Sequence, residues 1–239
     1  MKKRLDHLFN LLEETPEGSF FNPWYQQDEK HDLDEKSPRR RRRQLRTYLA
    51  DRLDSAKYLC VAEALGYQGG HFTGIAMTSE RILLGHQQKP HNIPPDDVFR
   101  ELKPERTSSP EVIEKGFSEP TATIMWKALY TLGLDPFEVV LWNALAWHPY
   151  DAGDGMLSNR TPTDAELEAG IPVLEAFFDL FPSAKVIAVG RKSEQCLDRL
   201  ELDYIPVRHP ANGGAPKFRR QMKAIMNRRI SNKKSRIPK

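Results

Sequence analysis

Apolar positions recur along the chain with two different spacings, and their alternation predicts the fold class. Short apolar runs predict four buried strands, at Tyr58–Ala62, Val139–Asn143, Lys185–Val189 and Tyr204–Val207. Helical spacing predicts helices around them, at Lys2–Glu14, Pro120–Leu132, Thr163–Phe181, Ser193–Leu200 and Pro216–Arg229. Because strands that alternate with helices form parallel sheets covered on both faces, we expect a three-layer α/β/α sandwich with a short four-stranded parallel sheet.

The first part of the chain has a different pattern. Thr15–Lys36 is rich in Pro, Gly and acidic residues and predicts an extended arm laid across the surface. Ser37-Pro38 then opens a second helix, which carries five consecutive arginines. We therefore expect an N-terminal helical and arm region over 1–55, an α/β/α domain over 56–230, and a basic tail over 231–239. Within the domain, Gly85–Glu119 predicts a long irregular insertion.

Charge is distributed unevenly. The net charge is +3, but the residues from Tyr204 to Lys239 include 11 Lys and Arg and no Asp or Glu. The first 203 residues therefore carry 25 basic and 33 acidic residues, a balance of −8. A concentrated basic segment favours a polyanionic partner such as DNA, although a solvated helix face with a basic tail remains an alternative.

Cysteine content and the apolar runs exclude several classes of protein. Two cysteines, Cys60 and Cys196, are too few for a disulfide framework or a four-thiolate metal site, and we expect no metal and no cofactor. No apolar run is long enough to span a bilayer. We expect a cytoplasmic, nucleoid-associated monomer with no membrane partner.

Polar and Gly-rich segments follow the four predicted strands, at Glu63–Phe72, Asn143–His148, Gly190–Lys192 and Arg208–Gly214. In a parallel sheet these segments meet at one edge, where ligands bind. The topology thus predicts a site built from all four.

The same segments resemble the uracil-DNA glycosylase superfamily, and most closely its iron–sulfur branch. Ala62-Glu63-Ala64-Leu65-Gly66 is similar to that branch's Gly-Glu-Ala-Pro-Gly motif, and Gly69–Gly74 to the segment that supplies a base-stacking aromatic residue. Leu141–Ala144 and Asn159–Thr163 are similar to the strand asparagine and the Asn-Arg-Thr-Pro turn. Arg208-His209-Pro210-Ala211 is similar to the His-Pro motif. The resemblance extends over about Tyr58–Met222.

The resemblance implies an activity that excises bases from DNA, and it implies roles for four residues. Phe72 would stack on a base turned out of the helix, and Asn143 would read its polar edge. Glu63 would position water or stabilise the sugar cation, and His209 would stabilise the departing base. Each has a structural alternative: a core anchor for Phe72, a turn for Asn143, a surface ion pair for Glu63, and capping or packing for His209. His148 is expected to have a structural or DNA-facing role.

Phosphate contacts are expected from Gly-rich loops, helix N-termini and basic side chains. The residues are Arg191, Lys192, Asn212, Gly213, Lys217, Arg219 and Arg220, together with Arg39, Arg40, Arg41, Arg42 and Arg43.

The chain also departs from the pattern that it resembles. The four cluster cysteines are missing, Ala62 and Leu65 replace Gly and Pro, and the segment after His-Pro lacks a bulky wedge. Gly66 stands where the uracil-specific branch excludes thymine with a Tyr. Three functions therefore remain open: excision of uracil or another deaminated or modified pyrimidine, excision of bulky hypermodified bases of phage DNA in antiviral defence, and DNA binding without catalysis.

Overall fold

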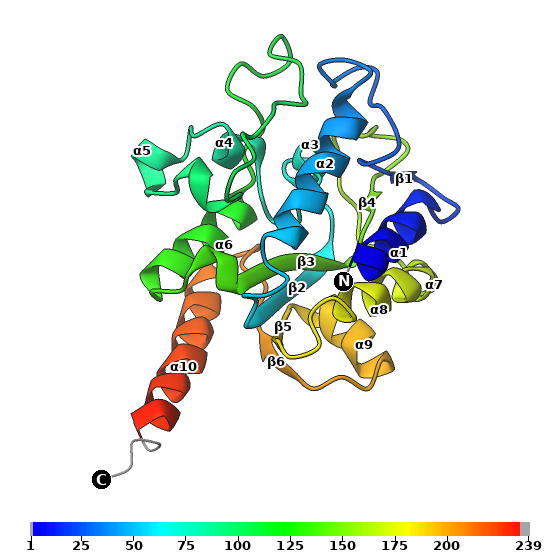
Figure 1. Cartoon of the computed structure of the whole chain (residues 1–239). Helices are drawn as coiled ribbons and strands as arrows, with labels where there is room; N and C mark the ends of the chain where they lie inside the picture. Colours follow the sequence, from blue (N-terminus) through cyan, green and yellow to red (C-terminus); the bar gives the residue numbers. More distant parts are fainter. Residues whose placement is uncertain (1, 235–239) are drawn as a thin grey trace.

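A four-stranded parallel sheet forms the centre of the computed structural model, which describes residues 2–234 (Figure 1). Its strands lie in the order β3-β2-β5-β6, with bounds β2 Tyr58–Ala64, β3 Val139–Leu145, β5 Lys185–Val189 and β6 Tyr204–Val207. The strands β2, β3 and β5 are almost wholly buried, as expected for a sheet covered on both faces. The predicted sheet is thus confirmed, with β2 and β3 each two residues longer than expected.

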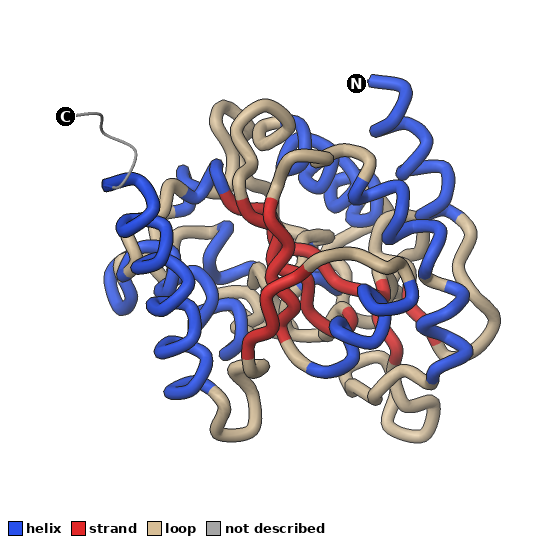
Figure 2. The backbone as a smooth tube through the Cα atoms, turned by 90° about the horizontal axis from the view of Figure 1, so that it is seen from below, coloured by secondary structure: helices blue, strands red, loops and turns tan. Residues whose placement is uncertain are grey.

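Helices cover both faces of this sheet (Figure 2). The helices are α1 Lys2–Glu13, α2 Ser37–Ala50, α3 Gly70–Thr73, α4 Glu80–Leu83, α5 Gln88–His91, α6 Pro120–Thr131, α7 Asp164–Ala169, α8 Ile171–Phe178, α9 Arg191–Arg199 and α10 Ala215–Lys234, with 3-10 turns at Pro95–Asp97 and Pro136–Glu138. Helices α8 and α9 pack on the strands, whereas α6 and α10 contact each other on the other side (Figure 1). The predicted α/β/α sandwich is confirmed.

One predicted helix is divided. The stretch Thr163–Phe181 contains two helices, which meet at Gly170. Pro172 has no N–H to donate to the preceding turn, so an uninterrupted helix through it is unfavourable. The predicted capping box of Thr163 and Glu166 is present at the start of α7.

The predicted surface arm is instead part of the core. Strand β1, Phe20–Phe21, pairs antiparallel with β4, His148–Pro149. Trp24 is fully buried, and its indole N–H donates to the carbonyl oxygen of Gly74 at 3.0 Å. The aromatic residues of this arm therefore hold it against the domain, because burying them removes a large apolar area from water.

The N-terminal residues share one hydrophobic core with the sheet. Leu5, Leu8 and Leu12 of α1 belong to the same buried cluster as the strand residues. The division near residue 55 therefore stays a prediction. Of the predicted tail 231–239, residues 235–239 lie outside the described residues.

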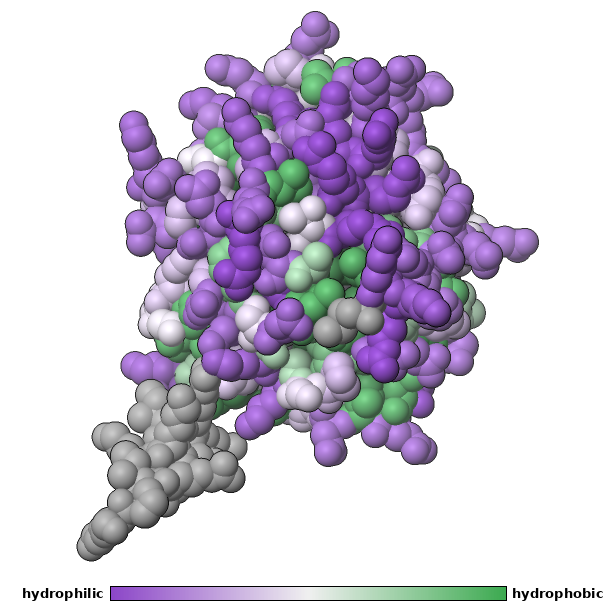
Figure 3. Space-filling view, viewed as in Figure 1, coloured by the Kyte–Doolittle hydropathy of each residue, from purple (hydrophilic) through white to green (hydrophobic). Residues whose placement is uncertain are grey.

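The insertion Gly85–Glu119 is irregular as predicted, with only short helical turns in it. On the face seen in Figure 3, hydrophilic residues predominate. Between residues 2 and 234, no helix is both long enough and apolar enough to cross a membrane.

Candidate active site

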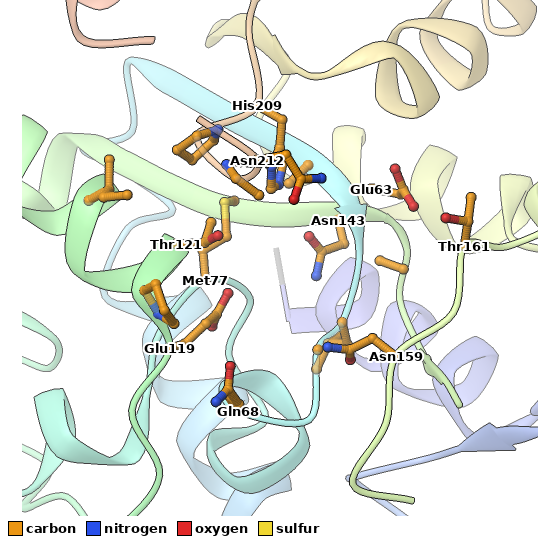
Figure 4. A pocket seen from close by; sticks show the side chains of 18 of the residues that line it. Glu63, Gln68, Met77, Glu119, Thr121, Asn143, Asn159, Thr161, His209 and Asn212 are labelled. Carbon is orange, nitrogen blue, oxygen red and sulfur yellow. Dashed lines mark hydrogen bonds between the residues drawn. The ribbon is translucent and has the colours of Figure 1, made fainter. Parts of the chain in front are cut away.

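A cavity of about 830 Å³ opens where β2 and β3 end (Figure 4). Three of the four segments expected at this edge contribute to it, with 63–66, Asn143 and 209–212. The fourth, Gly190–Lys192, does not line it, and the turn 159–161 does so instead. The beginning of α6 and the residues Gln68 and Met77 complete the wall. Its volume lies within the usual range of small-molecule sites.

Glu63 lines the cavity from β2, between the residue that pairs with Asn143, Ala62, and the last paired residue of the strand, Ala64. Its side chain is partly buried and makes no ion pair among the described residues. Burial raises the pKa of the Glu63 carboxyl, and the positive charge of Lys192 opposes this shift. The structural alternative of a surface ion pair is therefore wrong, and the carboxylate is available to a ligand.

Asn143 is only 2% exposed and projects into the cavity from β3. Its neighbours favour the orientation in which the side-chain oxygen accepts the N–H of Leu65 and the nitrogen donates to the carbonyl of Trp142, both at 3.2 Å. These two bonds leave one N–H and one lone pair of the amide unused. A buried amide with one free donor and one free acceptor suits a base edge that carries a carbonyl beside an N–H.

His209 lines the side of the cavity opposite Asn159 (Figure 4). The N–H of Ala211 donates to its Nδ1 at 3.2 Å, which makes Nδ1 an acceptor and places the ring proton on Nε2. Burial, and then the charge of Arg208, lower the pKa of His209, so the ring is neutral near pH 7. Gly190 makes room for it, because a Cβ there would lie 3.1 Å from the His209 Cβ.

Asn159 is a cavity residue to which the sequence analysis gave no role of its own. Its Oδ1 accepts the N–H of Tyr67 at 3.0 Å and so joins the loop after β2 to the Asn-Arg-Thr-Pro turn. The next residue, Arg160, makes a bidentate ion pair with Glu166, in which both N–O distances are 2.8 Å. These contacts fix the cavity wall opposite His209.

Two further cavity residues were missed. Met77 has a left-handed backbone, with φ of +47°, and its buried side chain reaches the cavity. Glu119 immediately precedes α6 and places its carboxyl at the far end of the cavity from Glu63 (Figure 4). No sequence signal marked Glu119, since it lies at the end of the irregular insertion.

Phe72 does not occupy the predicted position. It is fully buried and stacks on Phe117 with ring centroids 4.2 Å apart, and it does not line the cavity. The short helix α3 turns its side chain toward the insertion, so the prediction that Phe72 stacks on a base is wrong. No Phe, Tyr or Trp is among the described residues that form the cavity wall.

His148 has a structural role, one of the two expected for it. It is buried, its Nε2 lies 2.8 Å from the carbonyl of Ser158, and its Nδ1 lies 3.0 Å from Nδ1 of His71. The other nitrogen of His71 lies 3.0 Å from Asp28. This chain of contacts joins the N-terminal arm to the loop that ends at Asn159.

The predicted phosphate-binding residues around α9 and α10 lie at the surface. Arg191 and Lys217 line one hollow of about 510 Å³ together with Arg208. Arg219 and Arg220 line a second hollow, of about 480 Å³, with Lys127 and Lys223. Lys192 pairs with Asp164 at 2.9 Å. Asn212 and Gly213 are exposed, with φ of +50° and +72°, and only Asn212 of the two lines the cavity.

The arginine run is divided between structural and exposed positions. Arg41 is fully buried and pairs with Asp32, so its predicted contact with DNA is wrong. Arg40 makes a two-fold contact with Asp34, and Arg42 lies over the ring of Tyr25. Arg39 and Arg43 are exposed, although Arg43 also pairs with Glu105 at 2.6 Å. The five consecutive arginine side chains point in all directions around the axis of α2, so only some of them face solvent.

The family model described as the uracil DNA glycosylase superfamily matches residues 102–230, which include Asn143 and His209 but not Glu63. The crystal structure of wild-type SMUG2 from Pedobacter heparinus is similar at a TM-score of 0.57 and 14% sequence identity, covering 97% of this chain and 98% of that one. No curated protein matches.

Proposed function

The chain belongs to the uracil DNA glycosylase superfamily, and we propose that it is a DNA glycosylase that hydrolyses the N-glycosidic bond of uracil or another deaminated or modified pyrimidine. The observation that carries this proposal is the convergence of Glu63, Asn143 and His209 on one cavity. The three side chains supply a carboxylate, an amide and a neutral imidazole donor. The product is an abasic site.

Asn143 reads the base. Its remaining N–H and lone pair match a ring carbonyl beside an N–H, which is the edge that uracil presents. The base must leave the stack to reach this amide, because Asn143 is buried in the cavity wall. Recognition by a buried amide is selective, since an unmatched base leaves the amide without partners.

His209 stabilises the leaving base. When the bond between the base nitrogen and the sugar C1′ breaks, the electron pair stays with the base and its carbonyl oxygen gains negative charge. The Nε2–H of His209 donates to that oxygen, and this role is supported by its place in the cavity wall and by the bond that holds its Nδ1.

Glu63 acts at the sugar. Its carboxylate stabilises the positive charge that develops there, and it accepts a proton from the water that adds to C1′. The water oxygen forms the new bond to C1′ and its proton passes to Glu63. The base anion takes up a proton from solvent and leaves as the neutral molecule, while Glu63 returns its proton to solvent. No lysine lines the cavity among the described residues, and we propose simple hydrolysis without a Schiff-base step.

DNA binding is assigned to the exposed basic residues around the site. Arg191 and Lys217 share a hollow beside the loop that carries His209, and Arg219 and Arg220 extend the basic surface along α10. The exposed Asn212 and Gly213 offer backbone N–H groups, and Lys192 lies at the beginning of α9. Arg39 and Arg43 form a further basic surface on α2, and Arg40 and Arg42 are secondary members of it.

A second candidate substrate is a bulkier modified pyrimidine. It is favoured by Gly66, because a Cβ at that position would meet only Asn159, at 3.5 Å and beyond. Gly66 lines the cavity without a side chain, so no bulky group at this position limits the size of the base. Such an activity would suit defence against phages with modified DNA.

The test is a set of single- and double-stranded oligonucleotides that each carry one uracil, hypoxanthine, xanthine or 5-substituted cytosine, scored for abasic sites. Uracil-containing strands should be cleaved at the abasic site after alkali, and Glu63→Gln and His209→Ala should each slow excision by about 100-fold or more. Absence of abasic product from every strand would favour a DNA-binding protein without catalysis. Full activity of both variants would refute the roles assigned here.

A further inference from the structure

The cavity has a second acidic group, Glu119, to which neither the family resemblance nor the proposed mechanism gives a role. Figure 4 shows its carboxyl directed into the cavity beside Gln68, on the opposite side of Asn143 from Glu63. It therefore lies beyond the part of the base that Asn143 reads, away from the sugar end.

The side-chain carboxyl of Glu119 has no polar partner among the described residues. It precedes α6, but its side chain caps no N–H of that helix. The buried carboxylate of Glu80 is different, since it accepts the N–H groups of Thr107 at 2.7 Å and Ser108 at 2.9 Å. A carboxyl that faces a cavity without a protein partner is available to a ligand.

The fold also makes room for this carboxyl. A Cβ at Gly69 would lie 1.8 Å from Oε2 of Glu119 and 2.8 Å from its Cδ. Any side chain at position 69 would push the carboxyl out of its place. The glycine and the acid thus form a matched pair at the far end of the cavity.

We propose that Glu119 determines which bases the cavity accepts, by contacting the polar edge of the extruded base. A ring carbonyl at that edge is accepted only when the carboxyl of Glu119 is neutral. A neutral carboxyl donates one hydrogen bond and accepts another, so it is compatible with the carbonyl of uracil and with the amino group of cytosine. An ionised carboxylate only accepts, so it repels the carbonyl and still accepts from the amino group. The inference rests on the proposed function, because it requires that a base enters this cavity.

The surroundings of Glu119 favour ionisation of its carboxyl near pH 7. Burial raises the pKa of Glu119 to about 7, and no charged neighbour contributes to the shift. The charged or titratable groups that share the cavity are Glu63 after β2, Arg160 in the turn before α7, and His209 after β6. Arg160 is engaged by Glu166, so it does not offset the charge of Glu119.

The test measures binding separately from chemistry, in the Glu63→Gln background. Single-stranded oligonucleotides carry uracil, cytosine or a tetrahydrofuran abasic analogue at one central position, and affinities are measured between pH 6 and 8.5. Binding that exceeds that of the abasic analogue reports the base itself. The ratio of uracil-dependent to cytosine-dependent affinity cancels the effects of pH that both strands share, such as those on phosphate contacts.

With Glu119 present, this ratio should fall as pH rises above 7, by up to about tenfold per pH unit. In Glu119→Gln, whose amide keeps one donor and one acceptor but does not titrate in this range, the ratio should be independent of pH. An equal pH dependence in the two proteins, or no base-dependent binding by either, would overturn the inference. Base-dependent binding together with no excision by the unmodified chain would count against the proposed function alone.

Discussion

The guanidinium of Arg41 and the carboxylate of Asp32 form an ion pair in which neither side chain is exposed to solvent, with Nη2 2.9 Å from Oδ2. The same guanidinium donates to the carbonyls of Pro23 and Gln26. One arginine of a five-residue basic run therefore holds the N-terminal arm against α2. Its neighbours Arg39 and Arg43 are exposed.

This difference predicts opposite behaviour for two sets of variants. Arg41→Met should lower the free energy of unfolding by about 3–5 kcal/mol, because it leaves the Asp32 charge buried without a partner. The double variant Arg39→Gln, Arg43→Gln should change stability by less than about 1 kcal/mol, since exposed ion pairs contribute little. Urea denaturation measures both effects.

The same variants separate folding from DNA binding. If α2 contacts phosphates, the Arg39, Arg43 double variant should weaken binding and reduce its dependence on salt. An unchanged salt slope would mean that the exposed arginines are only solvated. A stable Arg41→Met protein would contradict the structural role of that residue.

A second prediction concerns the pH dependence of catalysis through Glu63. The mechanism requires an ionised carboxylate, and burial raises the pKa of this group, with Lys192 opposing. Single-turnover excision of uracil should therefore rise with pH through an ionisation above the ordinary value for Glu. The Lys192→Gln variant should move that ionisation to higher pH, because it removes the opposing positive charge. A profile that does not respond to Lys192→Gln would contradict the electrostatic role of that lysine.

Glu63 also carries a prediction for stability. Its pKa in the folded chain is above the value in the unfolded chain, so its contribution to stability is lost as pH rises through the folded value. Glu63→Gln should consequently be more stable than the unmodified chain at pH 7, and the two should converge below about pH 4. Thermal unfolding at several pH values measures the difference, and equal stabilities at pH 7 would argue against the raised pKa.

The buried histidines predict loss of stability in mild acid. Burial lowers the pKa of His71 to about 3, offset in part by its hydrogen bond to Asp28. Burial likewise lowers the pKa of His148 to about 4, offset in part by the carbonyl of Ser158. Histidines of the unfolded chain titrate near 6.5, so below that pH the unfolded chain binds protons that the folded chain does not.

The free energy of unfolding should therefore decrease as pH falls from about 6.5 to 4. The double variant His71→Gln, His148→Gln should be less stable at pH 7, by about 1–3 kcal/mol for each buried partner left unsatisfied, and should lose less of its stability in acid. His86→Gln is the matched control, because it replaces a histidine that is exposed. Equal acid sensitivity of the double variant and the control would show that other groups cause the effect.

The sequence predicted the four strands of the sheet and the edge at which the site lies. Both predictions succeed because buried parallel strands are short apolar runs and the polar loops follow them directly. The pairing of Ala62 with Asn143, which brings Glu63 and Asn143 together, depends on that pattern. The role of Phe72 was mispredicted because the direction of a side chain on a four-residue helix depends on its tertiary neighbour, here Phe117. Glu119 was missed for the same reason, since its place in the cavity is set by a contact with Gly69 far away in sequence.

The contact of Gly69 with Glu119 predicts that Gly69→Ala acts through the acid. Its added methyl group would displace the flexible end of the Glu119 side chain, because the contact is with the carboxyl rather than with backbone. Gly69→Ala should therefore remove the pH dependence of the uracil-to-cytosine ratio. In a Glu119→Ala background it should have no further effect, since coupled residues are not additive. Equal effects of Gly69→Ala in both backgrounds would place its action elsewhere in the loop.

The last prediction concerns the size of the base. The backbone of Gly66 is not left-handed, and a Cβ there meets Asn159 only at ordinary contact distance, so a Cβ is accommodated without strain. Gly66→Tyr should fill the space beside the base and reduce excision of 5-substituted pyrimidines by about tenfold or more, while uracil is affected less. Gly66→Ala is the matched control, because it changes the backbone equally and fills little of the space. If Gly66→Tyr slows excision of uracil and of 5-substituted bases by the same factor, this glycine does not set the size limit, and the argument for a bulkier substrate loses its structural support.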